Sequence, residues 1–412
     1  MLSRIAWKNI WRNKLRSGII ITSISLGLFG GVFAIAFMNG MANQMINDLI
    51  NLELANIQLH NPQFLLNDET IYTIENPEKK IERIKKIEQV KSVSSRTVRM
   101  GMASSSSTGK GVRINGINPE IEKQTTELSD KIIEGSFLED ERKNQIVVGE
   151  KLVKELKLKL NSKVILTLQT IDNNITYAAF RITGIFKTQN TMFDESNVFV
   201  RDKELKEIVH LRENRTNEIV VALSDNDFTK QVKSKLINEF EKEIHNEKLI
   251  VRTWDEINPS VKMMQQMSLQ FSFIFVIIIL VALSFGITNT MLMVVMERVR
   301  ELGMLMAVGM NKIKLAGMIF FETLYLSLTG AFAGMIISVG AISIAAKTGI
   351  DLSPIAEGFN AYGYSSIIFP EIDTAFYFYV MFFVVITAFL ASVYPARKAL
   401  KFNPAEAVRT EA

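Results

Sequence analysis

Four long apolar runs constrain this chain more than any other feature of its sequence. Residues 17–47, 263–296 and 374–396 contain no Asp, Glu, Lys or Arg, and residues 315–346 contain only Glu322. A helix that crosses a bilayer needs about 20 apolar residues, and each run exceeds that length. The runs therefore predict four transmembrane helices and exclude a soluble protein. The first run is too long for a signal peptide, whose apolar region spans about 7–15 residues, so we expect it to be retained.

The charges between the runs predict how the chain is oriented. Residues 1–16 are rich in Lys and Arg and lack acids, and residues 297–314 and 397–412 are also basic. Residues 347–373 contain one base, Lys347, against several acids. Short loops rich in Lys and Arg stay in the cytoplasm. We therefore expect both termini and the 297–314 link on the cytoplasmic side of the membrane, and the 347–373 loop on the other side. The net charge of +4 then belongs to the membrane face and does not indicate nucleic-acid binding.

The long insert between the first two runs, residues 48–262, should also lie outside. It contains no Cys, so it must fold around a hydrophobic core without disulfides. Residues 53–60 alternate like a strand, and residues 77–90 carry apolar side chains at helical spacing. Several further strand and helix patterns follow. The insert therefore predicts a large α+β domain, with residues 111–215 inserted into it as a second subdomain.

The chain shows no pattern of an enzyme active site or a metal site. Its three histidines have no partner at metal-ligand spacing: His60, His210 and His245. Residues 104–111 resemble a phosphate loop superficially, but Ser104 stands where the first Gly belongs and Gly111 replaces the Ser or Thr. We therefore expect no catalytic residues, no bound cofactor and no metal.

Three segments beside the predicted membrane spans carry specific motifs. The sequence reads ERVRELGMLMAVGM over residues 297–310, FETLYLSLTGAFAG over 321–334 and YPARKALKFNPAEAVR over 394–409. Together they resemble the FtsX-like/MacB-like permeases of ABC transporters, most of all the LolC/LolE type, which releases lipoproteins from the bacterial inner membrane. The resemblance extends to the outside domain, so it implies a MacB-like periplasmic core there and a location of the chain in the bacterial inner (cytoplasmic) membrane.

The resemblance implies a role for each motif. The 297–314 link would be a coupling helix that seats in a separate ABC ATPase dimer, which itself binds ATP and Mg. An interfacial helix without that role is the alternative. The link residues concerned are Glu297, Arg298, Arg300, Glu301, Leu302, Gly303, Ala307 and Gly309. The tail motif falls on Pro395, Arg397, Pro404, Glu406 and Arg409.

Further partners follow from the same resemblance. A second permease subunit, identical or paralogous, would pair with this chain. ATP-driven movement would pass up the spans to the outside domains, a process called mechanotransmission. Lipoprotein cargo would then leave the membrane for a periplasmic carrier. Two alternatives stay open: a MacB-like exporter subunit, and an FtsX-like scaffold that activates a cell-wall hydrolase. The sequence identifies neither the cargo nor the pairing.

Small, acidic and sulfur-containing residues in the spans suggest packing and contact sites. G-x-x-x-G pairs favour close helix packing, and a charge in a span either pairs with a neighbouring helix or reaches the membrane surface. These candidates are Gly27, Gly31, Glu322, Gly330 and Gly334. Methionine suits irregular apolar partners. Our hypothesis is that acyl chains enter beside Met38, Met41, Met45, Met263, Met267 and Phe271; ordinary contact with lipid or protein is the alternative.

Overall fold

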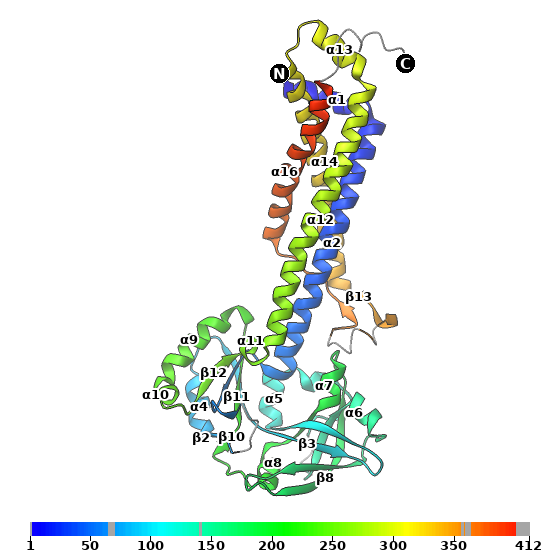
Figure 1. Ribbon diagram of the computed structural model, residues 1–412. Helices are drawn as coiled ribbons and strands as arrows, with labels where there is room; N and C mark the ends of the chain where they lie inside the picture. The colour runs from blue at the N-terminus through cyan, green and yellow to red at the C-terminus, as the bar shows by residue number, and fades with distance from the viewer. Residues whose placement is uncertain (1, 65–70, 140–141, 356–357, 359–363, 401–412) are drawn as a thin grey trace. The chain divides into compact units, whose positions relative to one another are not determined.

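The computed structural model describes residues 2–64, 71–139, 142–355, 358 and 364–400. The chain divides into two compact units, whose elements are labelled in Figure 1. The helical unit comprises residues 1–42, 265–351 and 367–412, and the α+β unit comprises residues 43–264 and 352–366.

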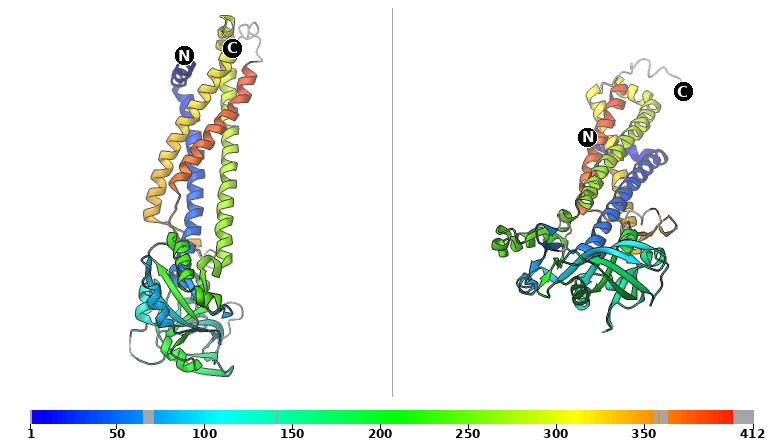
Figure 2. Two further views of the ribbon diagram at one scale, coloured as in Figure 1. Left: turned by 90° about the vertical axis from the view of Figure 1, so that its left-hand side faces the viewer. Right: turned by 60° about the horizontal axis from the view of Figure 1, so that its bottom comes forward.

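Within the part of the chain that the structure describes, four helices are long and apolar enough to cross a membrane. They are α2 (Lys14–Leu49), α12 (Pro259–Glu297), α14 (Lys312–Thr348) and α16 (Thr374–Ala399), and Figure 2 shows them running side by side. In the sequence, nearly all residues of the α+β unit come between the first and the second of these helices. The predicted fold class, four apolar helices and a large α+β domain, is confirmed.

Short elements complete the helical unit. The helices α1 (Leu2–Arg12) and α13 (Val299–Ala307) lie at the same end of it in Figure 1. The strands β13 (Ile350–Asp351) and β14 (Ile367–Ile368) pair near the other end. Side chains of Asn311 and Asp373 accept hydrogen bonds from the first turns of α14 and α16, which fixes where these helices begin.

In the α+β unit a β-sheet closes on itself because β7 pairs with both β3 and β8. The resulting barrel consists of β3 (Val90–Ser104), β4 (Gly109–Ile117), β9 (Asn197–Arg201), β6 (Gln145–Gly149), β8 (Ile175–Phe186) and β7 (Lys163–Gln169). Alternate residues of these strands point inward, so Ile114, Leu166 and Phe180 are buried in its core. β5 (Ile132–Gly135) extends the sheet beyond β8.

The same sheet continues past the barrel as an antiparallel arm. Its strands are β11 (Glu218–Leu223), β1 (Ile57–His60) and β12 (Ile250–Thr253). Their apolar residues pack with α4 (Pro77–Ile84) and α9 (Thr229–Glu239) in a separate core. The remaining elements are β2 (Ile74–Glu75), α5 (Pro119–Thr125), α6 (Glu150–Glu155), α7 (Thr191–Ser196), α8 (Asp202–Val209), β10 (Arg215–Thr216), α10 (Glu241–His245) and α11 (Trp254–Ile257), with helical turns at Ile50–Leu54, Leu128–Lys131, Asn226–Phe228 and Ser353–Ile355.

Two details differ from the sequence patterns. The strand expected over residues 53–60 begins only at Ile57, because Ile50–Leu54 form a π-helical turn and Ala55 then takes a φ of +54°. The predicted 111–215 insert supplies much of the barrel core, but residue 111 lies inside β4. The strand β3 serves both the barrel and the arm, so one continuous sheet joins them.

Buried ion pairs cross the junction between barrel and arm. Arg96 of β3 donates to Glu122 at 2.5 Å, and Arg113 of β4 donates to Glu218 at 3.0 Å. Arg96, Glu122 and Glu218 are almost completely buried. Burial alone would raise the pKa of Glu218, but Arg113 and Arg96 hold this pKa below its ordinary value.

Replacing Glu218 with Ala should lower the free energy of unfolding of the α+β unit by about 3–5 kcal/mol, because two arginines lose a buried partner. Glu239→Ala is the control: it removes a surface partner of Arg83 and should cost about 0–1 kcal/mol. The contribution of Glu218 is present at neutral pH and is lost as the pH falls through its lowered pKa. Fluorescence of Trp254, with Trp7 and Trp11 changed to Phe, measures the unfolding; equal effects of the two substitutions would refute the prediction.

Candidate functional site

The predicted coupling segment forms a short two-faced helix. Leu302 and Gly303 of α13 are buried against the core of the helical unit, which includes Ile10 and Leu315. The segment turns sharply after α13 because Gly309 takes a φ of +97°, a conformation that favours glycine. The opposite face is open: Arg300, Met304 and Ala307 are exposed, and Val308 just beyond the helix is 90% exposed.

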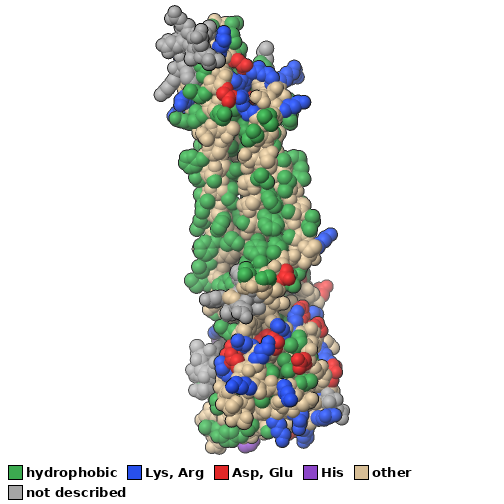
Figure 3. Space-filling model, turned by 90° about the vertical axis from the view of Figure 1, so that its right-hand side faces the viewer, with side chains coloured by type: hydrophobic (Ala, Val, Ile, Leu, Met, Phe, Trp, Pro, Cys, Tyr) green, Lys and Arg blue, Asp and Glu red, His purple; other side chains and the backbone are tan. Residues whose placement is uncertain are grey.

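Six charged side chains lie close to the buried side of α13 and the end of α12, and we call them the ionic cluster. They are Arg12, Arg16, Glu297, Arg298, Glu301 and Glu322. Together with Asn9, Asn13 and Ser17 they line a polar cavity of about 340 Å³. Figure 3 shows charged side chains gathered at this end of the helical unit, next to an uncharged surface along the helices.

The ionic cluster consists of a chain of contacts among four side chains and one separate ion pair. Arg298 donates through Nε to Glu301 at 2.9 Å and through Nη1 to Glu322 of α14 at 3.1 Å. Arg12 of α1 donates through Nη2 to both Glu301 oxygens, at 2.5 and 2.8 Å. Arg16 of α2 pairs with Glu297 at the end of α12. The chain of contacts therefore links α13 to α1 and, through Arg298, to α14, and the separate pair links α2 to the end of α12.

Charge in the cluster is balanced, with three arginines against three glutamates. The hydrogen bond from Arg12, assisted by Arg298, lowers the pKa of Glu301, so this carboxylate stays ionised at neutral pH. Glu322 and Arg298 are only 7% and 14% exposed, so each depends on the other for compensation of its charge. A balanced cluster offers no net charge for an added anion and acts as a structural link.

The structure divides the predicted coupling residues into three groups. Glu297, Arg298 and Glu301 face the cluster, and Leu302 and Gly303 face the core. Arg300, Ala307 and Gly309 are exposed. Sequence reasoning missed Arg12 and Arg16 as partners. Spacing gave no reliable signal, because Arg12 and Arg16 are four residues apart, as are Glu297 and Glu301, but each pair spans a break between two helices.

The predicted packing glycines lie against neighbouring helices of the same chain. A Cβ at Gly27 or Gly31 of α2 would meet Leu283 or Ile279 of α12. A Cβ at Gly330 or Gly334 of α14 would meet the α2 residues Ile24 and Ser25, respectively. Ser25 also donates to the carbonyl of Gly330 at 2.8 Å. These glycines thus permit α2 to approach both α12 and α14 closely.

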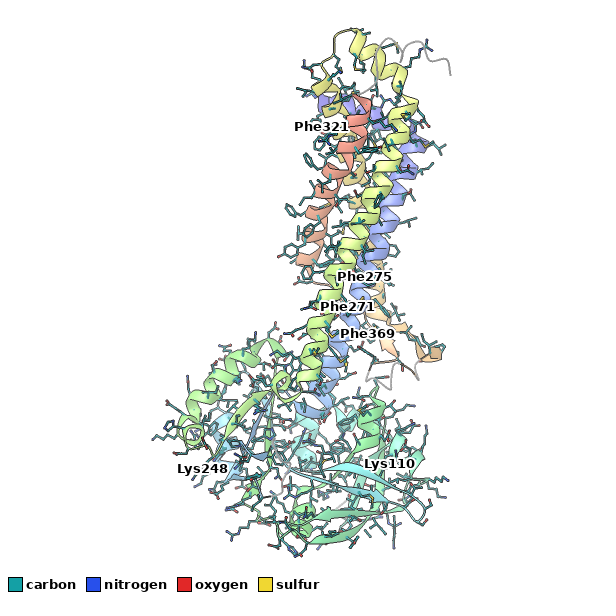
Figure 4. The ribbon with its side chains drawn as sticks, in the orientation of Figure 1. Lys110, Lys248, Phe271, Phe275, Phe321 and Phe369 are labelled. Atoms are coloured by element: carbon teal, nitrogen blue, oxygen red, sulfur yellow. The ribbon has the colours of Figure 1, made fainter. Side chains whose placement is uncertain are left out.

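The remaining predicted residues have different surroundings. Met263, Met267 and Phe271 of α12 are exposed, and Figure 4 shows Phe271 one turn from Phe275. Met38, Met41 and Met45 of α2 are partly buried. Of the tail motif, Pro395 is buried inside α16 and Arg397 is exposed in its last turn. Pro404, Glu406 and Arg409 lie outside the described residues.

A groove runs between α2 and α12 within the helical unit. Its volume is about 410 Å³, and it is lined mainly by apolar side chains with a few polar ones, Ser23, Asn289 and Thr290. Asn289 is exposed, and its amide has no hydrogen-bond partner among the described residues. The described residues also hold no group of three or more His, Asp or Glu side chains that could bind a metal.

Comparisons with known proteins agree with this architecture. Residues 17–239 match the family described as MacB-like periplasmic core domain, and residues 273–404 match FtsX-like permease C-terminal. The first match covers more than half of the chain. The two matches together include most of α2, of the α+β unit and of α12, and all of α13, α14 and α16.

Individual relatives are distant. An uncharacterized ABC transporter permease from Methanocaldococcus jannaschii is 24% identical over 68% of this chain, and the alignment spans 66% of that relative, just under two thirds. The lipoprotein-releasing system transmembrane protein LolC from Neisseria meningitidis serogroup B is 22% identical, covering 73% of this chain and 74% of LolC. Among solved structures, the periplasmic region of MacB from Actinobacillus actinomycetemcomitans aligns at 15% identity with a TM-score of 0.36, covering 53% of this chain and 98% of that one.

Proposed function

The chain belongs to the FtsX-like ABC transporter permeases that carry a MacB-like periplasmic core domain, and from this premise we propose that it releases lipoproteins from the bacterial inner membrane. As a permease it is a non-catalytic, multi-pass membrane subunit with an extracytoplasmic domain. Its family implies a partner ABC ATPase that hydrolyses the ATP. The cargo, its carrier and the site of coupling are parts of the proposal.

The coupling site that we propose is the open face of α13. Arg300, Met304 and Ala307 recur at helical spacing, and Val308 follows them. This face combines a base with exposed apolar side chains, a combination suited to a protein groove. The single observation that carries the proposal is that the opposite side of α13 is linked, through Glu301 and Arg298, to two other helices, α1 and α14.

The cluster supplies a path for movement in this proposal. Displacement of α13 by the ATPase would pull Glu322 of α14 through Arg298, and Arg12 of α1 through Glu301. Rigid helices would carry that displacement along the spans. This arrangement requires α13 and both termini to be cytoplasmic, as the basic flanks of the spans favour.

A second permease subunit fits the exposed side of α2 and α12. Only 17% of the apolar stretch of α12 is buried within the chain, against 33–44% of the apolar stretches of the other three spans. The unpaired amide of Asn289 would be costly in lipid, and a helix from a second subunit could supply its missing partner. The open position of Gly286, where a Cβ would meet nothing within 4 Å, leaves room for that approach.

Lipoprotein cargo is proposed on two grounds. The similarity to LolC extends over most of both chains. The second ground is exposed apolar surface outside the groove that the second subunit would occupy. The exposed residues Met263, Met267 and Phe271 provide apolar surface farther along α12, and we keep them as the candidate entrance.

Depletion of the chain from its own cells tests the proposed cargo. Lipoproteins should remain in the inner membrane, because the subunit that passes ATP-driven movement to them is missing. Membrane fractionation with quantification of acylated proteins measures the result, and restoring the chain is the control. Normal lipoprotein distribution would refute lipoprotein release. Loss of small-molecule export would then favour the exporter alternative, and loss of cell-wall hydrolysis the scaffold.

A further inference from the structure

The short helix α1 presents a basic and aromatic face that the proposed function does not use. Arg4, Trp7, Lys8 and Trp11 are exposed and recur at i, i+3, i+4 and i+7, so they share one side of the helix. The opposite side of the helix is anchored, because Ile10 is buried in the core of the helical unit.

Several contacts fix the direction of this face. The hydroxyls of Ser3 and Tyr325 of α14 are 2.7 Å apart. The Trp7 ring meets the rings of Tyr325 and Trp11 edge-on, with centroid distances of 5.6 and 5.9 Å. Ser17 donates to the carbonyl of Ile10 at 2.5 Å. The helix α1 is therefore held against α14, and its outer side chains stay available to an external ligand.

The chemistry of the face matches an anionic membrane surface. Within the described part of the chain, Arg4 and Lys8 make no ion pair with an acid. The two tryptophans are 43% and 47% exposed, and indole rings favour the headgroup level of a bilayer. The next exposed apolar residues along the chain, Leu15 and Ile19, are aliphatic and belong to the first spanning helix. Bases and indoles alternate along α1, and the exposed aliphatic side chains come later in the chain, as expected where a chain passes from the headgroups into the hydrocarbon.

We propose that this face of α1 binds the headgroups of anionic phospholipids, and that lipid binding alters how α13 is held through the contact between Arg12 and Glu301. Arg12 lies in the last turn of α1, at the end of this face, and its side chain is 58% exposed. Its Nη2 holds Glu301, so other guanidinium donors can turn toward a phosphate. Since Arg298 shares Glu301, an altered Arg12 contact changes the support of α13. This second step rests on the proposed coupling role of α13.

Tryptophan fluorescence tests the lipid site without any ATPase. In a Trp254→Phe chain, Trp7 and Trp11 are the only tryptophans. The purified chain is placed in mixed vesicles of phosphatidylglycerol and phosphatidylcholine, with bromine quenchers on the acyl chains of one lipid or the other. Brominated phosphatidylglycerol should quench more strongly, with an enrichment of roughly fivefold per base that faces the surface. High salt should weaken this preference.

Paired variants locate the effect. R4Q/K8Q should abolish the preference for phosphatidylglycerol, whereas K312Q/K314Q makes the same charge change on exposed residues of α14 and should keep it. Equal quenching by both lipids in the parent chain, or a preference that survives R4Q/K8Q, would overturn the lipid site. Protection of the tryptophans from both lipids when the partner ATPase binds would also overturn it, because the face would then belong to the ATPase.

ATP hydrolysis by the complete transporter tests the role of Arg12. Phosphatidylglycerol should change the hydrolysis rate of the parent complex, Arg12→Gln should remove that response, and Arg12→Lys should restore part of it. All three chains should keep the fluorescence preference. An unaltered response in Arg12→Gln would overturn the link to α13. If the complex hydrolyses no ATP while the preference persists, the proposed function fails and the lipid site stands.

Discussion

Replacing Glu322 with Ala should lower the free energy of unfolding of the helical unit by about 3–5 kcal/mol, because Arg298 would lose its most buried partner. Glu301 would remain beside Arg298, but Glu301 is 41% exposed and shares its charge with Arg12. Thermal unfolding of the purified chain in detergent micelles measures this loss as a lower apparent unfolding temperature.

The double variant R298L/E322L separates stability from transmission. Replacing a buried ion pair with apolar side chains of similar volume is often neutral or stabilising, so the double variant should unfold near the parent temperature. It should nevertheless release cargo poorly, because α13 no longer holds α14 through this pair. A Glu322→Ala chain as stable as the parent, or a double variant with full release, would contradict the role assigned to the pair.

Placing aspartates at Met304 and Val308 should weaken binding of the partner ATPase by about 100-fold or more. Both side chains are exposed in the single chain, and each would bury apolar surface worth about 1.5–3 kcal/mol in a protein groove. A loss of about 3 kcal/mol corresponds to roughly two orders of magnitude in affinity. Titration of the purified ATPase onto the chain in nanodiscs measures the affinity.

The matched control makes the same chemical change elsewhere. Met192→Asp with Ile175→Asp replaces one methionine and one β-branched residue, both exposed, in the α+β unit. This variant should bind the ATPase like the parent. Equal affinity of both double variants would show that the open face of α13 is not the binding surface.

The sequence was sufficient to predict the spans and the fold class. Charge-free runs are local signals, and a helix in a bilayer satisfies its backbone hydrogen bonds within the segment itself. The alternating patterns likewise located many strands of the α+β unit. The closure of the barrel was not predictable in this way, because β7 pairs with β3, whose paired residues lie some sixty positions earlier in the chain. The periodicity of a strand does not indicate which other strand it pairs with.

The candidate site was predictable in position but not in its contacts. The motif located α13, and Glu322 stood out as a charge within a span. Predicting the contact between Arg298 and Glu322 requires knowing that the chain turns after α13. Predicting the contact between Arg12 and Glu301 requires knowing that α1 packs beside α13. The open face depends on the same packing, since it determines that Val308 faces outward while Leu302 faces the core.

A photo-crosslinking amino acid at position 308 tests the central claim most directly. The chain is purified with its partner ATPase in nanodiscs, and position 192 of the α+β unit carries the same crosslinker in a parallel sample. The account predicts a covalent adduct between position 308 and the ATPase, and none from position 192. Capture of the ATPase from position 192, with only lipid attached at position 308, would contradict both the coupling surface and the proposed orientation.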